Sequence, residues 1–185
     1  MFKVAVLVGS LRRASINRKL ANALARLASP KLELTQLDLG AIPMFNEDLF
    51  APEFPPAVAT MKAAIAAADG VLFITPEYNR AAPAVIKNAI DWASRPWGTS
   101  VWANKPGALA GMSPGNIGSA VAQSSLRTTL IALDVHLLGQ PELYITYKEG
   151  LIADDLSITD ERVATLLTRF VDQFEAWIRR SKAGA

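Results

Sequence analysis

The feature that most constrains the fold of this chain is a repeated alternation of short apolar runs with longer stretches of helical spacing. Residues 4–8 and 71–74 are continuous apolar runs rich in β-branched side chains, a pattern typical of strands buried on both faces of a parallel sheet. The longer stretches repeat apolar residues with the period of an amphipathic helix. Strands that alternate with helices predict an α/β protein whose sheet is covered on both faces.

The alternation predicts five strands and five helices. We expect strands at residues 4–8, 32–37, 71–74, 106–111 and 135–144, the last interrupted at Gly139-Gln140-Pro141. We expect helices at residues 16–28, 57–68, 83–93 and 119–133, and a final helix with capping side chains Ser157 and Thr159 and an apolar stripe over residues 163–178. This pattern favours a doubly wound, flavodoxin-like parallel sheet in the order 2-1-3-4-5. The length of 185 residues fits a single domain over residues 1–185.

Two details complete this expectation. In the first helix, Leu20, Leu24 and Leu27 fall on one face at helical spacing. Residues 38–56 form a long loop with exposed aromatic side chains at Phe45, Phe50 and Phe54, and no role is assigned to it.

Composition excludes several classes of function. The net charge is only +2 and the basic residues are scattered, which argues against nucleic-acid binding. The chain has no cysteine, so it has no disulfide, no thiolate metal site and no cysteine nucleophile. No signal peptide pattern and no apolar run of about 18 residues occurs, so we expect a cytoplasmic protein without a membrane span. The hydrophobic fraction of 51% suits tight helix packing and a homo-oligomer.

Ligands of such sheets bind outside the carboxyl ends of the strands, where the winding direction reverses. For the order 2-1-3-4-5 this point lies between the first and third strands. The loops to consider are therefore residues 9–17, 76–82 and 112–118, all of which are polar and marked by glycine or proline.

The first of these loops leads into a helix N-terminus, where unpaired backbone N–H groups and the helix dipole favour an anion. Ser10, Ser15 and Asn17 add polar side chains, and Arg12 and Arg13 add positive charge. The loop lacks the pattern of a P-loop or a dinucleotide fingerprint, so one phosphate monoester fits better than a pyrophosphate. In the alternative interpretation, Ser15 only caps the helix and the arginines are solvated.

The second loop, Pro76-Glu77-Tyr78-Asn79-Arg80, follows a buried strand. It offers an aromatic face and backbone amides, against which a planar ring with polar edges could lie. The alternative is an ordinary turn before a helix that starts at Pro83.

Three segments together resemble the NADPH-dependent FMN reductase family, which includes bacterial quinone, chromate and azo-dye reductases. They are Gly9-Ser10-Leu11-Arg12 with Ser15 and Asn17, then Pro76-Glu77-Tyr78-Asn79, and then Lys87-Asn88-Ala89-Ile90-Asp91-Trp92. The resemblance covers nearly the whole chain. It implies a flavodoxin-like enzyme that binds FMN non-covalently and forms a homodimer or homotetramer.

The resemblance also implies a set of cofactor-binding residues. By the family's pattern the FMN phosphate is held by Ser10, Arg12, Ser15, Ile16 and Asn17, and the isoalloxazine and ribityl side by Pro76, Glu77, Tyr78 and Asn79. Ser113 and Gly115 would close over the other edge of the flavin. The chain departs from the family at Gly118-Ser119, where a glycine pair is common.

The implied activity is transfer of hydride from NADPH or NADH through FMN to a small acceptor by a ping-pong cycle, without a catalytic side chain. The acceptor would be a quinone, a flavin, an azo compound or a metal oxyanion such as chromate. Two other classes remain open: a flavodoxin-type electron carrier, which would normally be strongly acidic, and a flavin-free binding module on the same fold.

Three further groups have a structural interpretation. Glu77 is expected to form an ion pair with an arginine across a subunit interface. The neighbouring carboxylates Asp154 and Asp155 are expected to be solvated rather than to bind a metal. Trp92 and Trp97 are expected to be packing or interface residues.

Overall fold

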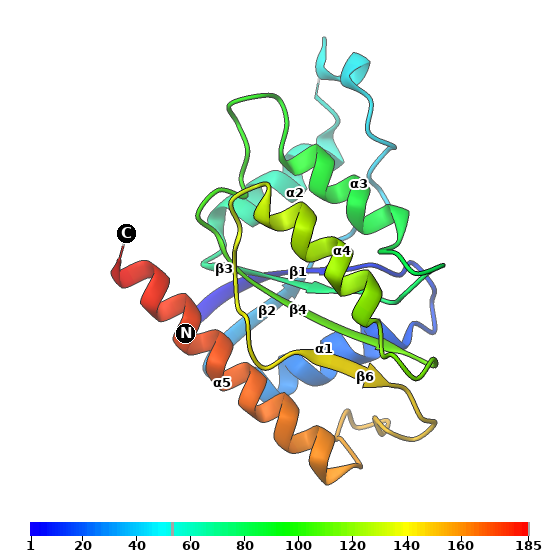
Figure 1. Cartoon of the computed structure of the whole chain (residues 1–185). Helices are drawn as coiled ribbons and strands as arrows, with labels where there is room; N and C mark the ends of the chain where they lie inside the picture. Colours follow the sequence, from blue (N-terminus) through cyan, green and yellow to red (C-terminus); the bar gives the residue numbers. More distant parts are fainter. Residues whose placement is uncertain (53, 185) are drawn as a thin grey trace.

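A parallel β-sheet forms the centre of the computed structural model, which describes residues 1–52 and 54–184 (Figure 1). The strands follow the order β2-β1-β3-β4-β5, with a sixth strand paired to β4. All pairings are parallel, and they confirm the flavodoxin-like order. The strands are β1 (Phe2–Val8), β2 (Leu32–Gln36), β3 (Gly70–Ile74), β4 (Pro106–Ser113), β5 (His136–Leu137) and β6 (Leu143–Thr146).

The last predicted strand is interrupted, as expected, and its two parts pair with different portions of β4. β5 lies beside Pro106 and Gly107 at the start of β4, whereas β6 lies beside its end, from Ala110 to Ser113. Pro141 stands between the two parts and has no N–H for a strand ladder. The chain therefore leaves the sheet there and rejoins it further along β4, which brings the end of β6 to the same edge as the ends of β1, β3 and β4.

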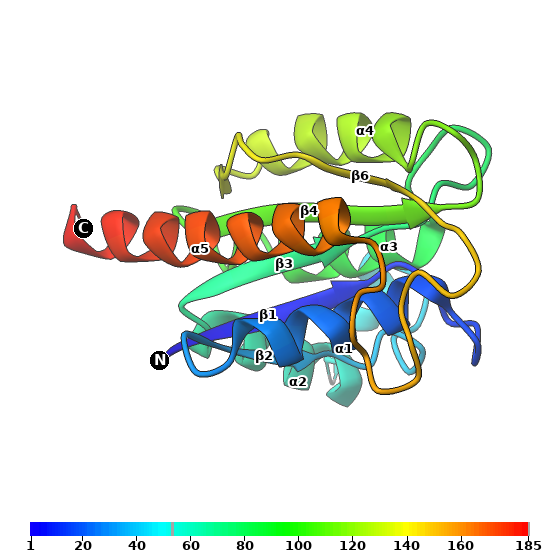
Figure 2. The same cartoon turned by 90° about the horizontal axis from the view of Figure 1, so that it is seen from below.

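Helices cover both faces of the sheet, as Figures 1 and 2 show. One apolar core lies between the sheet and the helices α1 (Ile16–Ala28) and α5 (Glu161–Ala183). The other lies between the sheet and α2 (Pro56–Ala67), α3 (Ala84–Ala93) and α4 (Ala120–Ile131). None of the helices described is both long and apolar enough to cross a membrane.

The structure adds one detail to the first helix and shows that the expected caps of the last helix are wrong. Leu20 and Leu24 are buried, but Leu27 is 38% exposed, because Ala28 rather than Leu27 completes the inner face of α1. The N-cap of α5 is Asp160, whose carboxylate accepts hydrogen bonds from the backbone N–H groups of Arg162 and Val163.

The two residues predicted as caps of this helix have other partners. The hydroxyl of Ser157 donates to the Asp155 carboxylate, and the hydroxyl of Thr159 donates to the Gly150 carbonyl. Asp155 and Asp154 also form exposed ion pairs, with Arg26 and Lys19 of α1 respectively. These contacts tie the segment before α5 to α1.

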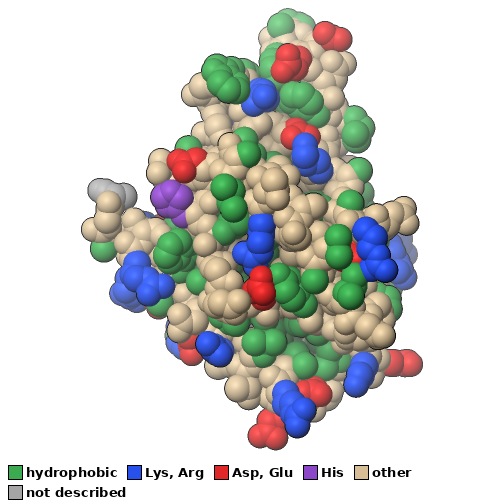
Figure 3. Space-filling view, in the orientation of Figure 1, with side chains coloured by type: hydrophobic (Ala, Val, Ile, Leu, Met, Phe, Trp, Pro, Cys, Tyr) green, Lys and Arg blue, Asp and Glu red, His purple; other side chains and the backbone are tan. Residues whose placement is uncertain are grey.

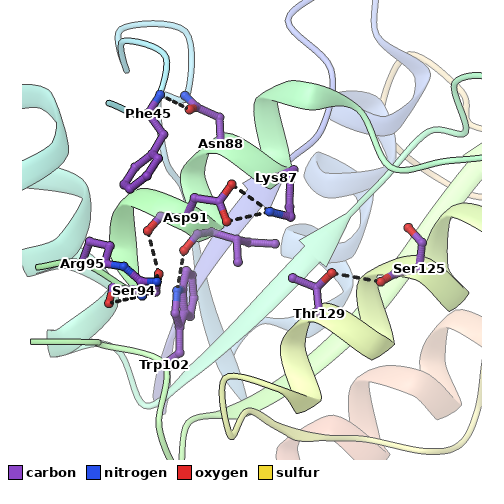
Figure 4. A network of polar contacts seen from close by, with 10 residues as sticks. Phe45, Lys87, Asn88, Asp91, Ser94, Arg95, Trp102, Ser125 and Thr129 are labelled. Carbon is purple, nitrogen blue, oxygen red and sulfur yellow. Dashed lines mark hydrogen bonds and ion pairs between the residues drawn. The ribbon is translucent and has the colours of Figure 1, made fainter. Parts of the chain in front are cut away.

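The long segment at residues 38–56 contains the short 3₁₀ helix η1 (Glu47–Phe50) and is anchored to α3. Phe45, Phe50 and Phe54 are partly buried against Trp92, with ring centroids 5.1–5.8 Å from its ring, so the expectation of exposed aromatic side chains is wrong. The Asn88 side chain accepts a hydrogen bond from the Phe45 N–H (Figure 4) and donates one to the Pro43 carbonyl. Trp92 is fully buried and is therefore a packing residue.

Candidate functional site

A cleft of about 560 Å³ lies at the carboxyl ends of β1, β3 and β4, within the range of small-molecule sites of ~300–1,000 Å³. Its position is the one expected for a doubly wound sheet. The cleft is lined by Ser10, Arg12, Ala14, Ser15, Ile16, Asn17, Pro76, Glu77, Tyr78, Met112, Ser113, Pro114 and Tyr147.

Most of the residues assigned from the sequence therefore come together. Asn79 and Gly115 lie outside the lining, in the turns next to it. Ala14, Met112 and Pro114 lie in the loops predicted to form the site but are not among the assigned residues, and Tyr147 lies outside all three loops. Tyr147 directly follows β6, so the rule that parallel strands present their carboxyl ends at one edge could have identified it.

The first wall of the cleft is the N-terminus of α1, which presents donors suited to an anion. The backbone N–H groups of Ile16 and Asn17 stand in the first helical turn and have no acceptor among the described residues. Ser10 is buried, yet its hydroxyl has no hydrogen-bond partner within residues 1–52 and 54–184. Arg12 is exposed and forms no ion pair with any residue that the structure describes. This combination of donors and positive charge suits an anion such as a phosphate.

Ser15 serves this wall in two ways. It is the N-cap of α1, and its hydroxyl oxygen accepts a hydrogen bond from the Arg18 N–H at 3.2 Å. The capping role weighed as an alternative is therefore real. Because a hydroxyl also carries one proton, Ser15 can still donate to a ligand in the cleft.

The side chain of Asn17 points to a different partner. Its Nδ2 donates to the Met112 carbonyl at 2.8 Å, and its Oδ1 accepts from the Met112 N–H at 2.9 Å. Asn17 is 1% exposed, so this pair is shielded from water. The contribution of Asn17 to an anion is thus its backbone N–H, while its side chain joins α1 to the end of β4.

The second wall is the loop after β3. Tyr78 and Ala81 exchange two backbone hydrogen bonds, and Asn79 and Arg80 both have left-handed φ angles, of 51° and 65°. This geometry is that of a tight type I′ turn. The chain reverses direction after Tyr78, so Pro76, Glu77 and Tyr78 line the cleft and Asn79 does not.

The first and second walls are in direct contact. The Gly9 N–H donates to the Ile74 carbonyl at 2.8 Å. A Cβ at Gly9 would lie 3.2 Å from the Pro76 side chain and 3.5 Å from that of Pro83. The two turns therefore meet at a glycine, and they form one continuous cradle at the point where the winding of the sheet reverses.

Glu77 links the second wall to the third. Its Oε2 accepts hydrogen bonds from the backbone N–H groups of Val121 and Ala122, at 3.0 and 3.1 Å, in the first turn of α4. Its Oε1 accepts from Arg80 of the same chain at 3.0 Å. Within the chain, the ionic partner of Glu77 is thus Arg80, and an additional arginine from across a subunit interface stays a prediction.

The third wall is the turn between β4 and α4, and it contains the departure from the family's glycine pair. Ser119 has a left-handed φ of 74°, a conformation that favours glycine. Its Oγ accepts a hydrogen bond from the buried Gln123 side chain. This second position of the pair therefore has a backbone suited to glycine, and the serine occupies it with a hydrogen-bonded side chain.

Comparisons with known proteins agree with this geometry. Residues 2–150 match the family model described as NADPH-dependent FMN reductase. The chain is 49% identical over 177 residues to a 2-hydroxy-1,4-benzoquinone reductase of a Burkholderia species, covering 96% of each chain. It is 42% identical to a quinone reductase of Pseudomonas putida, covering 99% of this chain and 98% of the relative.

One solved structure is similar to this chain in both sequence and fold. FerB, a flavoenzyme NAD(P)H:(acceptor) oxidoreductase from Paracoccus denitrificans, superposes with a TM-score of 0.95 at 46% sequence identity. The match covers 98% of this chain and 99% of FerB.

Proposed function

Because this chain belongs to the NADPH-dependent FMN reductase family, we propose that it binds FMN non-covalently and passes hydride from NAD(P)H through it to a quinone. The observation that carries this proposal is the cleft at the switch point of the sheet, where the N-terminus of α1 faces the turn after β3. Quinone is proposed as the acceptor because similar enzymes are named quinone reductases. A flavin, an azo compound or chromate are alternative acceptors of the same class.

The residues present fit FMN. Its phosphate matches the unpaired donors of the first wall: Ser10, Arg12, Ser15 and the backbone N–H groups of Ile16 and Asn17. Its ring matches the second wall, where Pro76 and Tyr78 offer flat apolar surface and Glu77 offers a backbone N–H. The third wall, with Met112, Ser113 and Pro114, would cover the opposite edge. Asn79 and Gly115 are proposed to support this site from the adjoining turns.

When bound, FMN supplies the redox chemistry, since it accepts a hydride and later releases the electrons to an acceptor. The chain binds and orients the cofactor, and donors near the ring would stabilise negative charge on it. Both oxygens of the Glu77 carboxylate already accept hydrogen bonds from protein donors. We therefore assign Glu77 no role as general acid or base.

An electron carrier is the competing class, and charge argues against it. Carriers of the flavodoxin type use acidic surfaces for steering, whereas this chain has a net charge of +2. The test is steady-state oxidation of NADPH, and separately of NADH, by the purified protein with FMN and benzoquinone, without a partner reductase. Sustained turnover supports the enzyme; reduction only in the presence of a partner reductase supports the carrier.

The proposal extends to a homo-oligomer. In Figure 3 hydrophobic side chains are scattered across the face that carries α4, and basic and acidic side chains also lie near its middle. Ile131 is 66% exposed, and Trp97 in the loop after α3 is 86% exposed. Light scattering should give a dimer or tetramer of the 19.9 kDa chain. A monomer at micromolar concentration would remove this part of the proposal.

Since NAD(P)H is a cytoplasmic metabolite, this activity would place the enzyme in the cytoplasm. Fractionation of expressing cells tests the location.

A further inference from the structure

We propose that Glu77 is a positioning residue, whose side chain holds the first turn of α4 against the loop after β3 and so sets the separation of two walls of the cleft. The expected effect of this clamp on FMN affinity rests on the proposed function. The clamp itself is a property of the chain and can be tested without cofactor.

Helix α4 has no side-chain cap from its own N-cap residue. A helix begins with backbone N–H groups that have no intrahelical acceptor, and a serine before the first turn usually accepts one of them. Ser119 stands at this position, but its left-handed backbone leaves its side chain without a cap hydrogen bond. Its hydroxyl instead accepts from Gln123. The first turn of α4 therefore needs an acceptor from elsewhere in the chain.

Glu77 supplies that acceptor across the cleft edge. One carboxylate oxygen accepts from both Val121 and Ala122, and a negative charge at a helix N-terminus is favourable. The side chain is only 6% exposed, so solvent screens this interaction little. Arg80, on the exposed side, donates to the other oxygen and balances the charge.

The Glu77 side chain joins two walls of the cleft that come from different parts of the chain. The backbone at Glu77 forms part of the second wall, and the turn that ends at α4 carries Ser113 and Pro114 of the third. Glu77 and Val121 are 44 residues apart along the chain, and the hydrogen bond between them joins the two segments directly. A shift of α4 would therefore widen the cleft on the side where a ring would lie.

Asp160 provides a matched control. It caps α5 in the same way, with one carboxylate oxygen accepting from two backbone N–H groups at 2.9 and 3.0 Å. Asp160 lies outside the lining of the cleft. Removing either carboxylate costs a helix cap, but only Glu77 connects two walls of the cleft.

The experiment compares Glu77→Ala, Glu77→Gln and Asp160→Ala. Amide hydrogen exchange of the cofactor-free proteins should be faster at Val121 and Ala122 in Glu77→Ala and unchanged there in Asp160→Ala. FMN should bind Glu77→Ala about fivefold more weakly, the factor that corresponds to loss of one ordinary cap. Asp160→Ala should lower the melting temperature but keep the FMN affinity. Glu77→Gln should recover most of the affinity, because its amide oxygen can accept from the same N–H groups.

Three outcomes would overturn the inference. Unchanged exchange at Val121 and Ala122 in Glu77→Ala would remove the clamp. Faster exchange in Glu77→Ala with unchanged FMN affinity would show that the clamp stabilises α4 without affecting the cleft. Equal loss of affinity in Glu77→Gln and Glu77→Ala, with a raised flavin potential, would mean that the carboxylate acts on the cofactor through its charge. If the wild-type protein does not bind FMN, but exchange at Val121 and Ala122 is still faster in Glu77→Ala, the proposed function is wrong and the clamp remains.

Discussion

The side-chain amide of Asn17 pairs with both backbone polar groups of Met112, across a separation of 95 residues in the chain. Asn17 stands in the first turn of α1, and Met112 stands near the end of β4. The amide therefore acts as a short piece of strand that completes the hydrogen bonding of β4 where the sheet ends. Together with the contact between Gly9 and Pro76, it holds the three walls of the cleft in one arrangement.

Replacing Asn17 with alanine should destabilise the protein even without cofactor. Two buried hydrogen bonds are lost and the Met112 backbone is left unpaired, which should lower the free energy of unfolding by about 2 kcal/mol or more. Urea unfolding of the cofactor-free protein measures this. A loss below about 0.5 kcal/mol, the scale of ordinary surface substitutions, would show that the pair does not stabilise the fold.

Replacing Arg12 with alanine should weaken FMN binding and leave the fold intact, because Arg12 is exposed and has no ionic partner in the described chain. A charge-assisted hydrogen bond is worth about 1.5–3 kcal/mol, so FMN affinity should fall by about tenfold or more. Riboflavin, which lacks the phosphate, should bind both proteins equally.

Arg13 is the matched control for this prediction, since it is also exposed but lies outside the cleft lining. Arg13→Ala should keep the wild-type FMN affinity. An equal effect of the two substitutions would point to general surface charge instead of a phosphate contact at Arg12.

Replacing Gly111 with alanine should prevent normal folding of the third wall. The new Cβ would lie 2.1 Å from the Ser119 hydroxyl oxygen and 2.3 Å from the Thr75 carbonyl oxygen. Overpacking of this kind costs about 1–3 kcal/mol, and thermal unfolding should show it. At Gly139 an added Cβ would meet no atom within 4 Å, so Gly139→Ala should leave the melting temperature nearly unchanged. Similar melting temperatures for both variants would contradict the packing described for Gly111.

Asp69 should contribute to stability in a pH-dependent manner. Its pKa lies below the usual value because the Lys182 ammonium donates a hydrogen bond to the carboxylate, an effect that outweighs its partial burial. A carboxyl whose pKa is lowered in the folded state stabilises the protein above its unfolded pKa of about 3.9, and this contribution is lost as the pH falls through the folded value. The difference in unfolding free energy between wild type and Asp69→Asn should therefore be present at neutral pH and shrink below about pH 4. A difference that stays constant over this range would contradict the assignment.

Much of the fold could be predicted because the strands are buried on both faces and are separated by helices of clear periodicity. The interruption at Pro141 was visible, since proline cannot continue a ladder. The cap of α5 cannot be predicted from the sequence, because Ser157, Thr159 and Asp160 are all good capping residues. The choice among them depends on contacts of Ser157 with Asp155 and of Thr159 with Gly150.

The position of the cleft can be predicted from the sequence, but the hydrogen-bond partners of the individual side chains in it cannot. The switch point of the sheet predicts which loops meet, and a family resemblance names the residues in them. The partners of Asn17 and Glu77 are backbone groups 95 and 44 residues away. No local pattern reveals such pairs, so the family resemblance places both residues at the cofactor without showing that their side chains join one wall of the cleft to another.

We propose above all that the cleft binds FMN with its phosphate at the N-terminus of α1. The most direct measurement is calorimetric titration of the cofactor-free protein with FMN and, separately, with riboflavin. Two charge-assisted hydrogen bonds to the phosphate are worth about 3 kcal/mol or more, so FMN should bind about 100-fold more tightly than riboflavin. Equal affinities for the two flavins, or no binding of either, would contradict the account.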